Sequence, residues 1–124
     1  MSLQVRDSHD KTSFMGDLVR LQQVLVNLVL NAMESMVTKP GSDKTVLIEL
    51  RKEPNHHILS VYDSGCGISE SEQARLFDAF FTTKPTGLGM GLAISRGIIE
   101  DHGGTLTFQP RTNGGSIFTI ALPC

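Results

Sequence analysis

The chain has few cysteines and no long apolar run. Of its two cysteines, Cys66 lies in a glycine turn and Cys124 is the last of 124 residues, so they do not form a disulfide framework. This usage is typical of a reduced, cytoplasmic protein. The longest apolar stretch, residues 24–30, is interrupted by Asn27 and is far too short to cross a membrane. We therefore expect no membrane contact by this domain.

The sequence also lacks an excess of charge of one sign. Eleven basic and 13 acidic residues give a net charge of −2, with both signs interspersed. This balance argues against a nucleic-acid partner. The length suits one domain, and 40% hydrophobic residues are enough for one core. We expect that domain to span residues 16–124, after an N-terminal segment, residues 1–15, that is partly vector-derived or a weak strand.

Local patterns predict helices that alternate with pairs of strands. Apolar residues recur every three or four positions over residues 18–37, with Asp17 as the expected N-cap. Ser69 and Glu72 form a capping-box pattern. The expected elements are helices over residues 18–37, 70–77 and 92–101, a loop over 80–91, and strands over 45–51, 58–63, 105–109 and 116–122. The fold class is therefore α+β, a two-layer α/β sandwich with a largely antiparallel sheet backed by about three helices.

The first expected helix carries a polar stripe beside its apolar face. Gln23, Asn27, Asn31 and Glu34 fall within an arc of roughly 80°. Their oxygen atoms suit Mg²⁺, which usually takes one or two ligands from protein and the rest from water and nucleotide. A solvated helix face is the alternative interpretation, although asparagine is a poor helix former and two occur here one turn apart.

Asp63 ends a strand on the side that its neighbours predict to be buried. It shares that side with Leu59 and Val61, and a buried carboxylate needs hydrogen-bond donors. The amino group of adenine is one candidate, whereas guanine has an acceptor at that position. The alternative is an Asp turn, in which the carboxylate accepts from the backbone near Gly65. Gly65 and Gly67 allow a sharp turn and a close approach to a flat ligand.

A glycine-rich segment stands directly before the last expected helix. Its residues are Gly87, Leu88, Gly89, Met90 and Gly91. Backbone N–H groups at the start of a helix favour phosphate, so this segment is a candidate phosphate loop. It is not a Walker sequence, because no Gly-Lys-Ser/Thr follows. Lys84 lies close by and either contacts a phosphate as a point charge or is an ordinary solvated lysine.

Four of these patterns occur in the order that is typical of one family. They are residues 23–36, 63–68, 76–84 and 87–92, which resemble the N, G1, F and G2 boxes of bacterial sensor histidine kinases. His102-Gly103-Gly104 and the ending at residues 115–123 also fit the family pattern. Residues 16–123 are thus similar to the ATP-binding catalytic domain of these kinases.

The resemblance implies the Bergerat fold, a mixed sheet backed by helices, with ATP held between a helix and a lid. It implies that Asn31 binds Mg²⁺, that Asn31 and Lys84 act in catalysis, and that Asp63 reads adenine. Ser116 then supplies a hydroxyl that helps to hold a water molecule in the adenine site, and Phe80 and Phe81 anchor the lid. The ATP-binding residues that the resemblance implies are Asn27, Asn31, Asp63, Gly65, Gly67, Ile68, Phe80, Lys84, Gly87, Leu88, Gly89, Met90, Gly91, Leu92 and Ser116.

Three features of the sequence depart from patterns that are common in this superfamily. Where its ATPases have a water-activating glutamate, the chain has Asn27, which cannot act as a base, so we expect slow hydrolysis and transfer of the γ-phosphate to a protein. Only five residues separate Phe81 from Gly87, a short lid that resembles those of nitrogen-regulation and oxygen-sensor kinases. Glu34 stands where many of these kinases have a basic residue.

The acceptor histidine is expected on a separate dimerisation domain. Ser8-His9-Asp10 lies too close to Asn27 to leave room for a helical hairpin, so the chain is expected to be part of a larger kinase and not to phosphorylate itself alone. The expected partners are that dimerisation domain and a downstream response regulator. An anti-sigma-factor-type serine kinase and a nucleotide-sensing module of the same fold are the alternatives.

Overall fold

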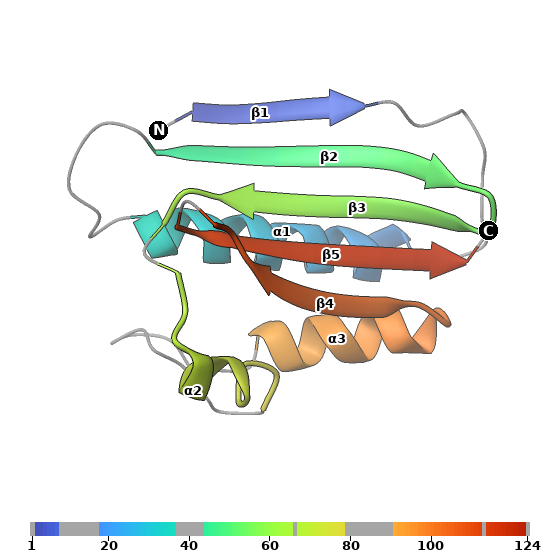
Figure 1. The fold of residues 1–124 in the computed structure, drawn as a ribbon. Helices are drawn as coiled ribbons and strands as arrows, with labels where there is room; N and C mark the ends of the chain where they lie inside the picture. Colours follow the sequence, from blue (N-terminus) through green and yellow to red (C-terminus); the bar gives the residue numbers. More distant parts are fainter. Residues whose placement is uncertain are drawn as a thin grey trace.

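The computed structural model of the chain describes residues 2–7, 18–36, 44–65, 67–78, 91–112 and 114–123. The elements in chain order are β1 (Ser2–Asp7), α1 (Leu18–Met36), β2 (Thr45–Glu53), β3 (His56–Asp63), α2 (Glu70–Gln73), α3 (Gly91–Asp101), β4 (Thr105–Pro110) and β5 (Ser116–Pro123) (Figure 1). No helix within these ranges is long and apolar enough to cross a membrane.

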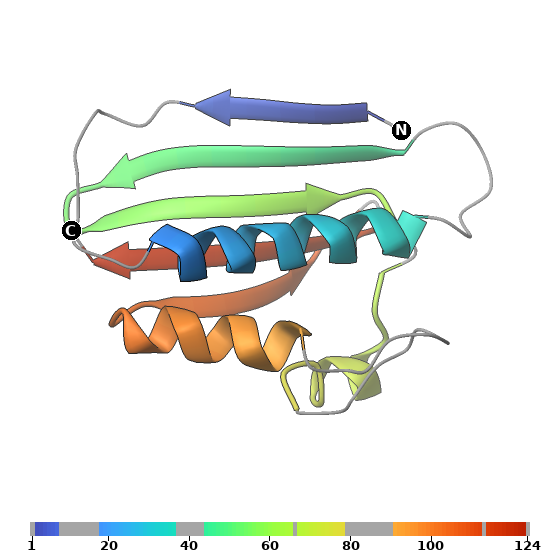
Figure 2. The same cartoon turned by 180° about the vertical axis from the view of Figure 1, so that it is seen from behind.

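The five strands form one sheet in the order β1-β2-β3-β5-β4. β1 pairs in parallel with β2, and all other neighbours pair antiparallel. α1 and α3 lie on the same face of this sheet, as the two opposite views in Figures 1 and 2 show. The expected α+β sandwich with a mixed, mostly antiparallel sheet is thus confirmed. The proposed domain boundary at residue 16 remains a prediction, although β1 is hydrogen-bonded into the sheet.

The order of the last strands brings distant segments of the chain together. β5 pairs with both β3 and β4, so the second hairpin inserts its later strand next to the first hairpin. In this register Asp63, the last residue of β3, lies opposite Ser116, the first residue of β5. Two residues predicted for the adenine site are therefore cross-strand neighbours.

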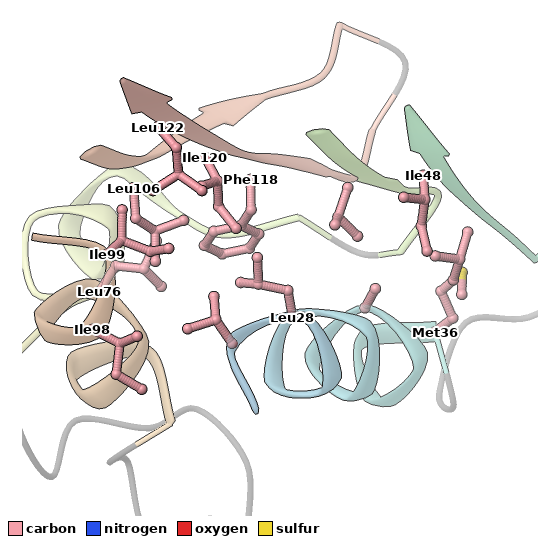
Figure 3. Packing of buried hydrophobic residues seen from close by; sticks show 14 residues of the cluster. Leu28, Met36, Ile48, Leu76, Ile98, Ile99, Leu106, Phe118, Ile120 and Leu122 are labelled. Atoms are coloured by element: carbon pink, nitrogen blue, oxygen red, sulfur yellow. The ribbon is translucent and has the colours of Figure 1, made fainter. Parts of the chain in front are cut away.

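One cluster of buried side chains fills the space between the helices and the sheet (Figure 3). On α1, Val24, Leu28, Ala32 and Met36 are buried at intervals of four residues, because an α-helix brings such positions to one face. This agrees with the predicted periodicity. The described part of α1 runs from Leu18 to Met36, and both the expected N-cap, Asp17, and the last expected helical residue, Val37, lie outside the described residues.

Aromatic rings from three segments meet in this cluster. Phe118 of β5 is 1% exposed, and its ring lies edge-on to Phe77 and Phe108 at centroid distances of 6.5 and 5.3 Å. Arg96 of α3 places its guanidinium 5.0 Å from the centroid of the Phe77 ring. Such ring and cation–ring contacts add to the burial of apolar surface, so the segment around Phe77 is fixed to both layers of the fold.

The second helix is shorter than the sequence predicts. Ser69 caps it as expected: its hydroxyl oxygen accepts from the Glu72 N–H at 3.3 Å and its O–H donates to the Glu72 carboxylate at 2.8 Å. The α-helix ends at Gln73, and tight turns continue to Asp78. The expected helix over residues 70–77 is corrected here, because the chain turns to bury Leu76 in the core.

The first hairpin is longer than expected. Strands were expected over residues 45–51 and 58–63, but β2 and β3 pair as far as Glu53 and His56. A two-residue turn, Pro54-Asn55, joins them directly. Charged and polar residues at this end hid the extra pairs from the alternating pattern, since the pairing depends on the backbone rather than on apolar side chains.

Candidate functional site

Asp63 is a carboxylate buried at the end of a strand. It is 1% exposed, and its Oδ1 accepts a hydrogen bond from the Gly65 N–H at 2.9 Å. Burial raises the pKa of this carboxyl group, while the Gly65 and Ser116 backbone N–H groups, the Ser35 hydroxyl and the Arg111 guanidinium oppose the rise. The carboxylate is thus held by donors from α1, from the turn after β3 and from β5.

The bond from Gly65 is the Asp turn that stood as the alternative to adenine recognition. The two interpretations are compatible, because an ionised carboxylate has about four lone-pair sites on two oxygens. The turn orients the carboxylate and leaves acceptor capacity for a further donor. A ligand amino group is a suitable donor, because a buried carboxylate is stabilised by each further hydrogen bond that it accepts.

Gly65 lies against the last turn of α1. A Cβ atom at this position would meet Ser35 Oγ at 2.5 Å and the Ser35 carbonyl oxygen at 2.9 Å. The Ser35 hydroxyl donates to the Ala32 carbonyl oxygen at 2.8 Å, so its one proton is shared between that carbonyl and Asp63. Glycine is therefore needed here for helix packing, whether or not a ligand approaches.

The turn between β4 and β5 closes the other side of Asp63. Gly115 has φ +98°, and a Cβ atom there would collide with the Asp63 carbonyl oxygen. Gly67 also has a positive φ, +77°, and faces the Gly115 backbone. Both glycines are required by backbone conformation, because L-residues rarely adopt these angles. Two further predicted site residues, Ile68 and Leu92, are half-buried and pack against the core cluster.

The polar stripe of α1 turns toward α3. Asn27 is half-buried, and its Nδ2 donates to the hydroxyl oxygen of Ser95 at 3.2 Å. Asn31 is half-buried one turn further on, whereas Gln23 and Glu34 are exposed. At the other end of the same helix pair, Arg20 and Asp101 form an exposed ion pair at 2.7 Å.

The helices α1 and α3 run antiparallel, because Arg20 pairs with Asp101 whereas Asn27, later in α1, pairs with Ser95, earlier in α3. Asn27 lies opposite Ser95, and Asn31 therefore lies beside the first turn of α3, which begins at Gly91. The first backbone N–H groups of a helix have no partner within the helix itself and favour anions. The described part of the predicted phosphate site thus combines a carboxamide with a helix N-terminus.

Several predicted site residues lie outside the described residues. They are Phe80, Phe81, Lys84, Gly87, Leu88, Gly89 and Met90. Of the others, Asp63, Gly65 and Ser116 are brought together, and Asn27 and Asn31 form a second group with the start of α3. His56 and His102 lie at element ends, where the His102 ring Nδ1 lies 2.8 Å from the Ile98 carbonyl oxygen.

Four residues at this site were not among the predicted site residues, although Ser35 and Gly115 lie within segments that resemble the family pattern. Ser35, Ser95, Arg111 and Gly115 contact motif residues that are distant along the chain. Ser95 has one local indication, since a small polar residue interrupts the apolar face of its helix and is fully buried. Arg111 and Ser35 look like ordinary surface or helix-end residues in the sequence.

Comparison with known proteins identifies the family. Residues 16–124 match the family described as histidine kinase-, DNA gyrase B-, and HSP90-like ATPase, and the chain belongs to this family. It is 42% identical over 108 residues to the C4-dicarboxylate transport sensor protein DctS of Rhodobacter capsulatus, an alignment that covers 87% of this chain. As a member of this family the chain is an ATP-binding domain, and the predicted resemblance to sensor histidine kinases is confirmed.

Solved structures show the same relationship. The catalytic domain of histidine kinase ThkA matches 98% of this chain with a TM-score of 0.85 and 35% identity, and 78% of that domain is covered. Another structure, of ThkA in complex with response regulator protein TrrA, matches with a TM-score of 0.79 and 33% identity. The chain spans only 16% of DctS and 33% of the ThkA chain in that complex.

Proposed function

We propose that this chain is the ATP-binding catalytic domain of a two-component sensor histidine kinase and transfers the ATP γ-phosphate to a histidine on a separate dimerisation domain. The observation that carries the proposal is the buried Asp63 carboxylate, which is oriented by Gly65 and retains acceptor capacity. Adenine presents an amino donor to such an acceptor, whereas guanine presents a carbonyl. We therefore expect the site to prefer adenine nucleotides.

The phosphates would lie toward the start of α3. Its backbone N–H groups favour negative charge, and Asn31 of α1 lies beside this first turn. The side-chain oxygen of Asn31 is a ligand of the type that Mg²⁺ prefers, and one protein ligand is usual when nucleotide phosphates supply others. When bound there, Mg²⁺ would neutralise charge on the β- and γ-phosphates. Lys84 is proposed to contribute a positive charge to the same phosphates.

Asn27 stands where ATPases of the superfamily have a water-activating glutamate, so this position supplies no base for water. Asn27 has an amide in place of a carboxylate, and its nitrogen is engaged with Ser95. We therefore expect slow hydrolysis. The nucleophile would be the imidazole nitrogen of the acceptor histidine: an N–P bond forms, the bond between the γ-phosphorus and the ADP oxygen breaks, and the imidazole proton passes to solvent.

The proposed partners follow from the proposal that this chain binds ATP and that another domain carries the acceptor histidine. The dimerisation domain of the parent kinase would supply the acceptor histidine, and a response regulator would receive the phosphoryl group afterwards. ThkA, a relative by structure, forms a complex with the response regulator TrrA. The expected location is the cytoplasm, on the basis of the cysteine usage.

Nucleotide titration tests the binding part of the proposal. Calorimetry of this chain with ADP and ATP, each with and without Mg²⁺, should show binding that Mg²⁺ strengthens. GDP and GTP should bind at least about tenfold more weakly, because an acceptor facing Asp63 leaves two buried acceptors unpaired. Equal affinity for adenine and guanine nucleotides would contradict the assignment of Asp63.

Phosphotransfer tests the catalytic part. The chain is mixed with the parent kinase's dimerisation domain and γ-labelled ATP, and the chemistry of the labelled residue is determined. We expect acid-labile phosphohistidine on the added domain and no label on this chain alone. Acid-stable phosphoserine on an added protein would favour the anti-sigma-type serine kinase, and nucleotide binding without any transfer would favour a nucleotide-sensing module.

The Asn31→Ala variant tests the metal assignment within the same assay. It should lose the Mg²⁺-dependent gain in ATP affinity and the phosphotransfer, while its urea unfolding midpoint stays near that of the original chain. Gln22→Ala is the matched control, because it removes an exposed carboxamide from α1 outside the polar stripe. An unchanged Mg²⁺ response in Asn31→Ala would refute the metal role.

A further inference from the structure

Arg111 reaches from the β4–β5 turn to the end of β3. Its guanidinium donates a hydrogen bond to the Asp63 carbonyl oxygen at 2.9 Å, across 48 residues of sequence. The same guanidinium lies 5.6 Å from the centroid of the Tyr62 ring. A single side chain thus contacts the two last residues of β3, one through its backbone and one through its ring.

The turn that carries Arg111 is itself fixed. The Arg111 N–H donates to the Gly115 carbonyl oxygen at 3.3 Å, and the Gly114 N–H donates to the Arg111 carbonyl oxygen at 3.2 Å. Gly115 in turn lies directly against the Asp63 carbonyl group. Backbone hydrogen bonds fix the turn that carries Arg111, and sheet pairing fixes the end of β3. The bond from the guanidinium to the Asp63 carbonyl oxygen therefore links two fixed segments.

We propose that Arg111 is a positioning residue for adenine, which fixes the end of β3 through the Asp63 carbonyl group. This inference rests on the proposed function of Asp63 as the adenine acceptor. It adds a residue from the β4–β5 turn, outside the four boxes, to the determinants of nucleotide affinity.

The electrostatic surroundings of Asp63 support this role. Gly65 and Ser116 present neutral backbone N–H groups, and Ser35 of α1 presents a neutral hydroxyl. Among the described residues, Arg111 is the one whose charge acts on the carboxylate, and it opposes the rise in pKa that burial causes. Arg111 as a residue is exposed, so solvent and salt weaken this effect without changing its direction.

Arginine suits this position better than lysine for a geometric reason. Its planar guanidinium can donate to a carbonyl and lie over an aromatic ring at once, whereas a lysine ammonium is a compact charge without a planar face. Arg111→Lys therefore keeps the charge near Asp63 and loses the fixed contact. Arg111→Gln loses the charge and keeps an amide donor of shorter reach.

Mg²⁺-free ADP binding over a range of pH tests the inference. At neutral pH, Arg111→Gln should bind ADP about 3–10-fold more weakly, the range expected for losing one charged hydrogen-bond donor. A plot of ADP affinity against pH should fall on its acidic side, called here the acidic limb. In Arg111→Gln this limb should move to higher pH, because Asp63 then protonates more readily. Arg111→Lys should restore the position of that limb and only part of the affinity.

Arg51→Gln is the matched control. Arg51 is also exposed and is paired with Glu53 at 3.2 Å, but it lies near the β2–β3 turn, at the end of that hairpin opposite to Asp63. It should leave both affinity and profile unchanged. If Arg111→Gln binds ADP with the original affinity and profile while the original chain prefers adenine, the inference about Arg111 fails and the proposed function stands. If the original chain shows no adenine preference, the proposed function fails first. A loss of affinity without a shift of the acidic limb would also overturn the inference.

Discussion

The side-chain amide of Asn27 donates to the hydroxyl oxygen of Ser95 at 3.2 Å and so joins α1 to α3. Ser95 is fully buried, whereas Asn27 is half-buried. This bond uses one of the two N–H donors of the Asn27 amide, so the amide oxygen and the second N–H are the groups that can contact a ligand. The contact therefore couples the helix that carries Asn31 to the helix that follows the glycine-rich segment.

Removing the Ser95 hydroxyl tests this coupling. In Ser95→Ala, the free energy of unfolding should fall by about 0.5–1.5 kcal/mol, since the Asn27 amide loses a partner in a partly buried place. Urea unfolding of Ser95→Ala, Asn27→Ala and the double variant forms a cycle whose interaction energy isolates the bond. Additive effects in that cycle would show that the bond contributes nothing. Arg20→Gln, which removes an exposed ion pair between the same helices, should cost less.

Local patterns predicted the elements, and long-range contacts decided how they meet. The spacing of Leu28, Ala32 and Met36 and the Ser69 capping box depend on neighbours within a few residues, so the sequence alone indicates them. The insertion of β5 between β3 and β4 was not predicted, because strand pairing between distant segments leaves no local pattern.

In the candidate site, too, local motifs indicate single residues, and long-range contacts decide how these residues meet. The order of the motifs indicated Asp63 and Ser116 separately, and only the sheet register places them opposite each other. Arg111 was missed, because its contact with the Asp63 backbone depends on a turn conformation formed by glycines with positive φ. Every residue has a backbone carbonyl group, so a sequence motif does not indicate which carbonyl a distant side chain will contact.

The buried carboxylate of Asp63 should make stability depend on pH. Burial raises its pKa in the folded chain, whereas in the unfolded chain it titrates near 3.8. Between these two values the folded chain binds more protons than the unfolded one, so the free energy of unfolding falls as the pH rises through this window. The difference in stability between Asp63→Asn and the original chain should therefore shift in favour of asparagine over the same window.

Urea unfolding of both chains at a series of pH values measures this difference. Other carboxyl groups titrate in both chains, so their effects cancel. Glu70→Gln, at an exposed position, controls for the loss of one negative charge. A difference that moves in favour of aspartate as the pH rises would show that hydrogen bonds and Arg111 outweigh burial. In calorimetry, Asp63→Asn should also lose adenine preference while it remains folded.

The Ser69 cap should control the local stability of α2. In Ser69→Ala, the Glu72 N–H loses its acceptor and the Glu72 carboxylate loses its donor, so the helix start should lose about 1 kcal/mol. Hydrogen exchange at the Glu72 amide should become faster, while exchange in β3 and β5 stays unchanged. Unchanged exchange at Glu72 would mean that Leu76 and its core contacts alone hold this segment.

Two glycines should respond to alanine in opposite directions. Gly97 lies in the middle of α3, where an added Cβ meets nothing within 4 Å, so Gly97→Ala should raise the free energy of unfolding by about 0.5–1 kcal/mol. Gly104 precedes β4, where a Cβ would collide with the Ala121 carbonyl oxygen of β5 and lie 3.0 Å from a Leu122 methyl carbon. Gly104→Ala should therefore lower the free energy of unfolding by about 1–3 kcal/mol.

Thermal and urea unfolding of the two variants give a direct comparison, because both add the same methyl group. The affinity for ADP separates the effects further: Gly97→Ala should leave it unchanged, since residue 97 is exposed and lies two residues beyond Ser95 on a different face of α3. Gly104→Ala presses on β5 at Ala121, five residues from Ser116, so any loss of ADP affinity should be small beside its loss of stability. A Gly104→Ala variant as stable as the original chain would show that β4 and β5 can separate locally without disturbing the core.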